Sequence, residues 1–365
     1  MKIEKMTKDI AYEELQKFFM GETPFVLFGT GTSCALDTAF GMEALQKHLE
    51  SEINNNSISC EEKTEWDTVL DKLKADIDLE TAMDSIKKES LIDKVVKHTA
   101  QLVGTKDKEY SYKILSGQST WPAISLLSCI VDGCSKELHV ATTNYDLLAE
   151  YAFEKAKIPY INGFSGGVCR YLDWSEACSC IAYLDKVPKG QRWIINPKFK
   201  KHICLYKVHG SLNTFKIGSK LIENNAWMYD PPSEVSRVMI TPGTSKYERL
   251  HLDRHELLGS YDQALENHNR FLFLGFGFND NQLNNDSIKR KLKDQHCFGL
   301  IITRDCNQRI ESLLSECENL WLVCKNDDKD KNGTRILNQK YKNPLYLENK
   351  KLWDLDEFTN EILGG

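Results

Sequence analysis

The chain has 365 residues, of which 41% are hydrophobic and 27% charged, a composition that can bury one large α/β domain or two smaller ones. Its formal net charge of −6 disfavours a dedicated nucleic-acid-binding protein, although a local basic patch is compatible with it. The sequence has no run of 18 apolar residues and no apolar signal core at its N-terminus. We therefore expect neither a membrane span nor secretion, and place the protein in the cytoplasm.

The first expected strand lies early in the chain. Apolar spacing predicts a helix over residues 8–20, and the apolar run 25–28 is typical of a buried strand. A glycine-rich turn follows at once, and we expect a helix to begin near Leu36. Such a turn binds phosphate through backbone amides and the helix N-terminus. Its residues are Gly29, Thr30, Gly31, Thr32 and Ser33. Because Cys34 replaces the third glycine of the dinucleotide motif, the turn alone is weak evidence.

Residues 46–135 have a different pattern. Apolar residues recur at three- and four-residue spacings among mixed charges, and no apolar run typical of a buried strand interrupts them. This predicts a helical insertion, whose charges form either a solvated face or, alternatively, a surface for another protein. We expect a core of residues 1–45 and 136–325, the insertion at 46–135, and a C-terminal tail and helix at 326–365.

The apolar run 138–141 is the central expected strand. It ends in a cluster of mostly small polar residues, 142–146, before the next expected helix. Open α/β sheets bind their ligands at the carboxyl ends of such strands. The alternative is that Thr143 or Asn144 only caps the following helix.

Two further strand ends carry candidate residues. His209 follows the apolar run 203–208. A lone histidine is commonly a core residue, but at the end of a strand and beside a flexible turn a catalytic role is as well supported as a core role. The run 271–274 is followed by Gly275, Gly277, Phe278 and Asn279, and the run 298–302 leads to Asp305. Residues 170–202 mix aromatic and basic side chains, which can contact nucleic acid, but we favour a surface hairpin.

The chain has 12 cysteines and no C-x-x-C pair. A four-cysteine zinc site normally has two close pairs. We therefore expect free thiols and no bound metal.

Together, the glycine-rich turn, residues 142–146, His209 with Gly210, and the turn that begins at Gly275 resemble the ordered motifs of the sirtuin family. The resemblance covers roughly residues 21–45, 136–165 and 200–325. It implies an α/β fold with a Rossmann-like parallel sheet of sirtuin type, in which the helical insertion replaces the zinc module. Thr143 stands where protein-deacylating sirtuins have glutamine. The pattern is closer to the bacterial sirtuin-like proteins of antiphage defence that degrade NAD+, and is most similar to the sirtuin-like partner of a HerA-type ATPase.

The resemblance implies an NAD+ glycohydrolase. Asn144 would orient the ribose and the attacking water, Asp146 would hold the carboxamide, and His209 would act as general base, a task suited to a residue type that exchanges protons near neutral pH. We expect the turn at Gly29 to bind the pyrophosphate and the turn at Gly275 to approach the adenosine, with Arg304 or Asp305 near the adenine. The expected NAD+-binding residues are Gly29, Thr30, Gly31, Thr32, Ser33, Thr143, Asn144, Asp146, Gly275, Gly277, Phe278, Asn279 and Asp305.

Two alternatives remain open, a protein deacylase that uses the same pocket and an NAD+-sensing scaffold without turnover. We also expect a homo-oligomer in the bacterial cytoplasm, regulated by a HerA-type ATPase, with nucleic acid involved only indirectly and no membrane contact. The helical insertion is the candidate assembly surface.

Overall fold

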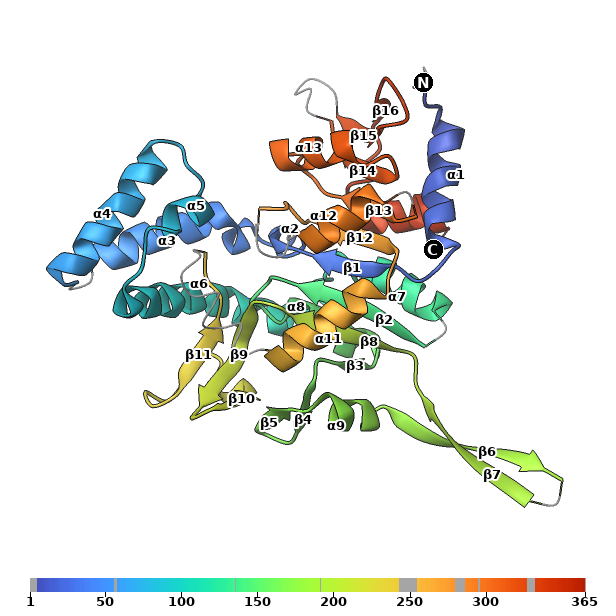
Figure 1. Cartoon of the computed structure of the whole chain (residues 1–365), viewed down its shortest axis with the longest axis horizontal. Coiled ribbons are helices and arrows are strands. Elements are labelled where there is room, and N and C mark those ends of the chain that lie inside the picture. The colour runs from blue at the N-terminus through green and yellow to red at the C-terminus, as the bar shows by residue number, and fades with distance from the viewer. Residues whose placement is uncertain are drawn as a thin grey trace.

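The structure is a computed structural model that describes residues 5–55, 58–134, 136–190, 192–242, 255–279, 286–294, 296–326 and 332–364. Its centre is a nine-stranded sheet in the order β16-β15-β14-β13-β12-β1-β2-β8-β3 (Figure 1). Strands from β14 to β3 run parallel, and β15 and β16 continue the edge antiparallel. The strands are β1 (Phe25–Phe28), β2 (Glu137–Thr142), β3 (Tyr160–Ile161), β8 (His202–Lys207), β12 (Arg270–Leu274), β13 (Phe298–Ile302), β14 (Leu320–Lys325), β15 (Gly333–Asn338) and β16 (Leu345–Glu348).

Helices cover both faces of this sheet. Successive side chains of a strand point to opposite faces, so each buried strand contributes to a core on either side. Val26 and Phe28 belong to one buried core, and Phe25 and Leu27 to the other. The first core includes residues of α1 (Lys8–Phe19), α6 (Glu89–Leu115), α7 (Ile124–Gly133), α8 (Leu148–Ala156) and α14 (Leu355–Phe358). The second includes residues of α9 (Trp174–Ser179), α11 (His255–Glu266), α12 (Asp286–Lys293) and α13 (Gln308–Glu316). The predicted α/β fold with a Rossmann-like parallel sheet is thus confirmed.

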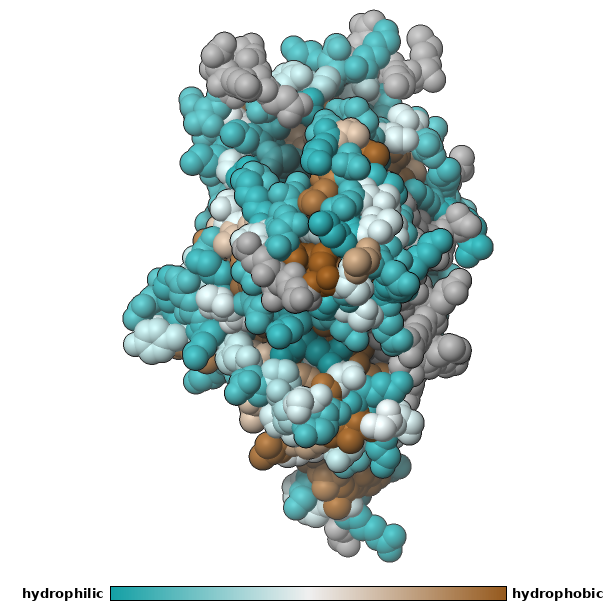
Figure 2. Space-filling view, turned by 90° about the vertical axis from the view of Figure 1, so that its left-hand side faces the viewer, coloured by the Kyte–Doolittle hydropathy of each residue, from teal (hydrophilic) through white to brown (hydrophobic). Residues whose placement is uncertain are grey.

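The stretch predicted as a helical insertion, residues 46–135, contains most of α3 (Met42–Asn55), which begins before it, and all of α4 (Cys60–Lys74), α5 (Leu79–Met83), α6 and α7. Helices α3 to α5 and the start of α6 enclose a core of their own, which includes Leu49, Trp66 and Met83. They project from the sheet at the left of Figure 1, and Figure 2 shows that the face on this side is mostly hydrophilic. Polar residues of these helices such as Glu43, Lys47 and Lys74 are exposed, whereas Glu62 of α4 is buried.

A second, five-stranded sheet in the order β11-β9-β10-β5-β4 was not predicted. It contains β4 (Phe164–Gly166), β5 (Arg170–Leu172), β9 (Gly210–Ile217), β10 (Lys220–Glu223) and β11 (Ser236–Met239). Gly210 begins β9 with a φ of +72°, and a Cβ there would lie 2.0 Å from the Val238 carbonyl oxygen. Glycine is therefore required at the turn that directly follows His209.

The aromatic and basic stretch contains the predicted hairpin, formed by β6 (Ala182–Lys189) and β7 (Arg192–Phe199). It projects from the body of the molecule at the lower right of Figure 1, and hydrophobic residues gather at the lower end of Figure 2. Large side chains on both of its strands are exposed, including Leu184 at 67% and Trp193 at 68%.

Two local expectations were wrong. Helix α2 (Thr30–Cys34) begins immediately after Gly29, not near Leu36. Residues after Lys325 do not form only a tail and a helix, because β15 and β16 extend the main sheet there.

Candidate active site

The carboxyl ends of β1, β2, β8 and β12 meet at one edge of the sheet, because these neighbouring strands run parallel. The order of the strands reverses about β1, which is where open α/β sheets form a ligand crevice. A cavity lies there. Its core side is lined by Gly29, Thr30, Thr143, Asn144, Tyr145, Asp146, His209, Ile240, Thr241, Pro242, Phe276, Gly277, Phe278 and Asn279. Its other wall comes from the start of α3 and from the insertion that follows. The residues that line this wall are Phe40, Met42, Leu45, Glu80, Thr81, Asp84, Leu102 and Val103.

The cavity therefore gathers most of the predicted site residues. Those that line it are Gly29, Thr30, Thr143, Asn144, Asp146, His209, Gly277, Phe278 and Asn279. The predicted residues that do not line it are Gly31, Thr32, Ser33, Gly275 and Asp305, all within the described ranges. The roles assigned to all of these residues stay predictions.

Asn144 is anchored at the cavity wall. Its amide nitrogen donates to the Gly29 carbonyl oxygen at 3.1 Å and to the Ser33 hydroxyl at 3.0 Å. Its side chain is buried, yet the amide oxygen, Oδ1, has no hydrogen-bond partner among the described residues. A buried acceptor without a partner is costly. Oδ1 of Asn144 is thus oriented to accept a hydrogen bond from a ligand or water.

Asp146 lies in the same loop and is buried. Its carboxylate accepts hydrogen bonds from the Ser33 hydroxyl at 2.8 Å and from the Leu148 backbone N–H at 3.3 Å. Burial raises the pKa of Asp146 to about 6, against the opposing attraction of the Lys207 ammonium. Ser33 lies behind the cavity wall and connects Asp146 with Asn144, so it positions both side chains without lining the cavity.

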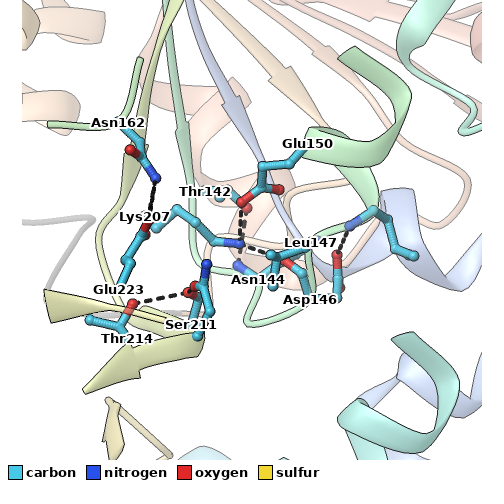
Figure 3. Close-up of polar contacts among 12 residues, drawn as sticks. Thr142, Asn144, Asp146, Leu147, Glu150, Asn162, Lys207, Ser211, Thr214 and Glu223 are labelled. Atoms are coloured by element: carbon cyan, nitrogen blue, oxygen red, sulfur yellow. Dashed lines mark hydrogen bonds and ion pairs between the residues drawn. The ribbon is translucent and has the colours of Figure 1, made fainter. Parts of the chain in front are cut away.

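Lys207, the last residue of β8, is a site component that the sequence did not reveal. It is buried, and its Nζ donates to the Glu150 carboxylate at 2.7 Å and to the Asp146 carbonyl oxygen (Figure 3). This charge pair fixes the loop after β2 to the start of α8. The signal in the sequence was a lysine at the end of an apolar strand, directly before Val208 and His209.

Asp107 of α6 is a second component that the sequence did not reveal. It is fully buried and accepts hydrogen bonds from the Leu147 N–H at 2.7 Å, the Tyr151 hydroxyl at 2.8 Å and the Tyr229 hydroxyl at 2.9 Å. Burial raises the pKa of Asp107, and these donors oppose the shift. Through this carboxylate, a helix of the insertion holds the end of the loop that bears Asn144.

His209 lies at the cavity with 8% of its surface exposed. Its ring stacks on Tyr145, with ring centroids 6.5 Å apart and an interplanar angle of 29°. Its carbonyl oxygen accepts from the Ile240 N–H at 2.8 Å, and the Tyr145 hydroxyl donates to the Ile240 carbonyl oxygen. These contacts hold the imidazole at the edge of β8, where its ring can serve a reacting group.

The glycines of the two turns differ in what surrounds them. The Gly31 N–H donates to the Gly275 carbonyl oxygen at 3.0 Å, and a Cβ on Gly31 would lie 2.7 Å from the Gly275 Cα. Both residues thus allow two backbones to touch. Gly277 lines the cavity, and a Cβ there would meet only side-chain atoms, the nearest at 3.3 Å. Asp305 is 74% exposed and pairs with Arg304, outside the cavity.

A family model described as the SIR2-like domain matches residues 138–334, more than half of the chain. The match begins within β2 and ends within β15, so the turn at Gly29 and α3 to α7 lie outside it. No curated protein matches the chain. Within the described ranges, each helix falls short of the length or the apolarity that crossing a membrane requires.

Proposed function

The chain belongs to the SIR2-like family, whose domains use NAD+ as a substrate, and from this premise we propose that it is an NAD+ glycohydrolase. It cleaves the bond between nicotinamide and C1′ of the ribose, and water takes the place of nicotinamide to give ADP-ribose. The observation that carries this proposal is the buried, unpartnered Oδ1 of Asn144 at the cavity wall.

The side chains around this oxygen suit the proposed chemistry. Hydrolysis requires that the ribose be held and a water be oriented toward C1′ as positive charge develops there. Asn144 Oδ1 accepts a hydrogen bond from a ribose hydroxyl or from the water. His209 removes the proton from the water, and Asp146 binds the carboxamide of nicotinamide.

The wall formed by the start of α3 and by the insertion favours water over a peptide as the second reactant. Met42, Leu45 and Leu102 face the strand-end residues across the cavity. We infer that these apolar side chains leave room for water but not for an extended peptide, which supports hydrolysis. A protein deacylase remains the alternative activity, because it would begin from the same pocket and the same substrate.

The central test measures nicotinamide release from NAD+ by the full chain and two variants. Asn144→Ala and His209→Ala should each lower turnover by at least about 100-fold, the scale of a positioned general base. His98→Ala is the matched control, since His98 is similarly buried at 6% and does not line the cavity. Near wild-type turnover in either cavity variant, with the protein folded, would refute the proposed roles.

A product assay separates the alternatives. Incubation with an acetylated peptide and NAD+ should yield free ADP-ribose and leave the peptide acetylated. O-acetyl-ADP-ribose as the main product would show a deacylase instead. Binding of NAD+ without release of nicotinamide would show a sensing scaffold.

We also propose that the protein is a homo-oligomer that depletes NAD+ in bacterial antiphage defence together with a HerA-type ATPase. The resemblance of its motifs supports this role, and the exposed apolar side chains of the β6–β7 hairpin support a contact surface. Mass measurement at micromolar concentration should give a multiple of 41.9 kDa. A monomer that does not co-purify with an ATPase encoded beside it would contradict this setting.

A further inference from the structure

A second cluster of reactive side chains lies at the opposite end of β2 and β8, roughly 15 Å from the cavity along the strands. Glu137 pairs with His202 across the two parallel strands, and His139 pairs with Cys204. Because residues two apart on a strand face the same side, all four side chains share one face of the sheet. That face packs against the core formed with α9 and α11.

The donor atoms of three of these side chains converge. Cys204 Sγ lies 3.4 Å from His202 Nε2, which lies 3.8 Å from Glu137 Oε2. All three atoms lie within 4.8 Å of one another. Tetrahedral zinc bonds of about 2.0–2.3 Å set ligand atoms roughly 3.5 Å apart. Small side-chain rotations would therefore bring the three atoms onto one ion.

The tautomer of His202 fits a metal ligand. Its Nδ1 lies 2.8 Å from the Lys200 carbonyl oxygen, and a carbonyl oxygen can only accept. Nδ1 therefore carries the proton, and the lone pair of Nε2 points toward Cys204 and Glu137. A backbone carbonyl that orients the far nitrogen in this way is typical of histidines that bind metal.

Burial argues against the alternative that Cys204 and His202 form a thiolate–imidazolium pair. His202 is 2% exposed and Cys204 5%. An isolated thiolate and imidazolium would each lose their hydration at these buried positions, which is costly, whereas a bound cation would balance the charge of the thiolate. The Glu137 side chain is 40% exposed, which leaves a path for an ion from solvent.

We propose that Glu137, His202 and Cys204 bind one divalent transition-metal ion of the zinc class. A sulfur, an imidazole and a carboxylate together suit zinc better than magnesium or calcium. His139 Nε2 lies 3.6 Å from the other carboxylate oxygen of Glu137, so His139 orients this ligand, and water takes the fourth position. The ion ties β8 to β2 and is independent of the proposed hydrolysis of NAD+.

The expectation of no metal rested on the absence of paired cysteines. These ligands leave no such spacing, because they come from two strands far apart in the sequence that become neighbours only in the sheet. Their alternation, E-x-H on β2 and H-x-C on β8, is the sequence signal that remains.

The test titrates zinc alone into the chelator-treated full chain and measures stoichiometry and affinity. Wild type should bind one equivalent at this site, and cobalt substitution should give thiolate-to-cobalt absorption. Cys204→Ser and His202→Gln should each weaken binding by about 10- to 100-fold or more, the scale seen for disturbed metal sites. Cys317→Ser is the matched control, because Cys317 is also a buried free cysteine, and it should bind as wild type does.

Glu137→Gln keeps the test decisive if the buried variants fail to fold, because its side chain is partly exposed. It should weaken zinc binding by at least about 10-fold while the melting temperature of the metal-free protein stays unchanged. Absence of a bound equivalent in wild type would overturn the proposal. Equal binding by wild type and Glu137→Gln would overturn it as well, since the ion would then be held elsewhere, for example by the exposed Cys60 or Cys180.

Discussion

Replacing Asp146 with asparagine should stabilise the ligand-free protein at neutral pH and impair turnover. The carboxylate is 6% exposed and accepts from Ser33 and Leu148. Asparagine has the same shape, and its oxygen can still accept from the Leu148 N–H. Its nitrogen can donate to the Ser33 hydroxyl, so both contacts persist. Only the buried negative charge is removed.

The magnitude follows from the pKa of Asp146, which burial raises from 3.8 to about 6. Each unit corresponds to about 1.4 kcal/mol, so the ionised carboxylate lowers the free energy of unfolding by roughly 3 kcal/mol. The folded state binds more protons than the unfolded state between pH ~4 and ~6. The free energy of unfolding of wild type therefore falls as pH rises through that window. Asp146→Asn lacks this fall, so its advantage should be near zero at pH ~4 and roughly 3 kcal/mol at pH ~7.

Urea unfolding of both proteins at pH 4.5 and 7.5 measures this gap. Asp37→Asn is a control of opposite sign, because a hydrogen bond from Lys106 lowers the pKa of Asp37. That variant should be less stable than wild type at neutral pH, by under about 1 kcal/mol because the pair is partly exposed. Turnover of NAD+ by Asp146→Asn should fall about 10- to 100-fold, the value of one hydrogen bond to a charged group. A variant no more stable than wild type at pH 7.5, or a gap that does not change with pH, would refute the reasoning.

Three further sets of substitutions test the architecture of the site. Lys207→Met leaves the buried carboxylate of Glu150 unpaired and should lower the free energy of unfolding by about 3–5 kcal/mol in chemical denaturation. Adding Glu150→Leu to this variant should recover most of the lost stability. Asp107→Ala should lower stability by a similar amount and reduce turnover. Asp107→Asn should retain most of both, because its amide can still accept from the Leu147 N–H and donate to the two tyrosine hydroxyls. Equal loss in both variants would show that the charge itself is needed. Gly31→Ala should lower the melting temperature of the ligand-free protein, whereas Gly277→Val should leave it nearly unchanged and weaken NAD+ binding in calorimetry; the reverse pattern would exchange the roles of the two glycines.

Five strands of the main sheet, β1, β2, β8, β12 and β13, were predictable because each contains a short apolar run. Their shared edge was predictable too, since the carboxyl ends of neighbouring parallel strands must meet. In this way the sequence placed Asn144, His209 and Gly277 together, and all three line the cavity. The start of α2 was missed because its residues, TGTSC, have weak helix propensity. Its position depends on the backbone contact with Gly275, which no local pattern shows.

The second sheet and the buried charges were missed for related reasons. Strand β5 has three residues, and two of them are Arg170 and Tyr171. It is therefore too short to show the alternation of apolar and polar residues that predicts a strand. Lys207 and Asp107 look like ordinary surface charges in the sequence. Their burial depends on Glu150, on Tyr229 and on the loop after β2, which only the folded chain brings near them.

Helix α6 connects the separate core of the insertion with the cavity at the strand ends. It has 27 residues, a length of about 40 Å. It packs in the insertion through Leu91 and Val95, lines the cavity through Leu102 and Val103, and holds the Asn144 loop through Asp107. If NAD+ binds in the cavity, as proposed, a protein that docks on α3 to α5 and shifts this helix would change the affinity for NAD+, and linkage would require NAD+ to change the affinity for that protein by the same factor. Depletion of NAD+ by the proposed activity would then change how tightly such a protein binds.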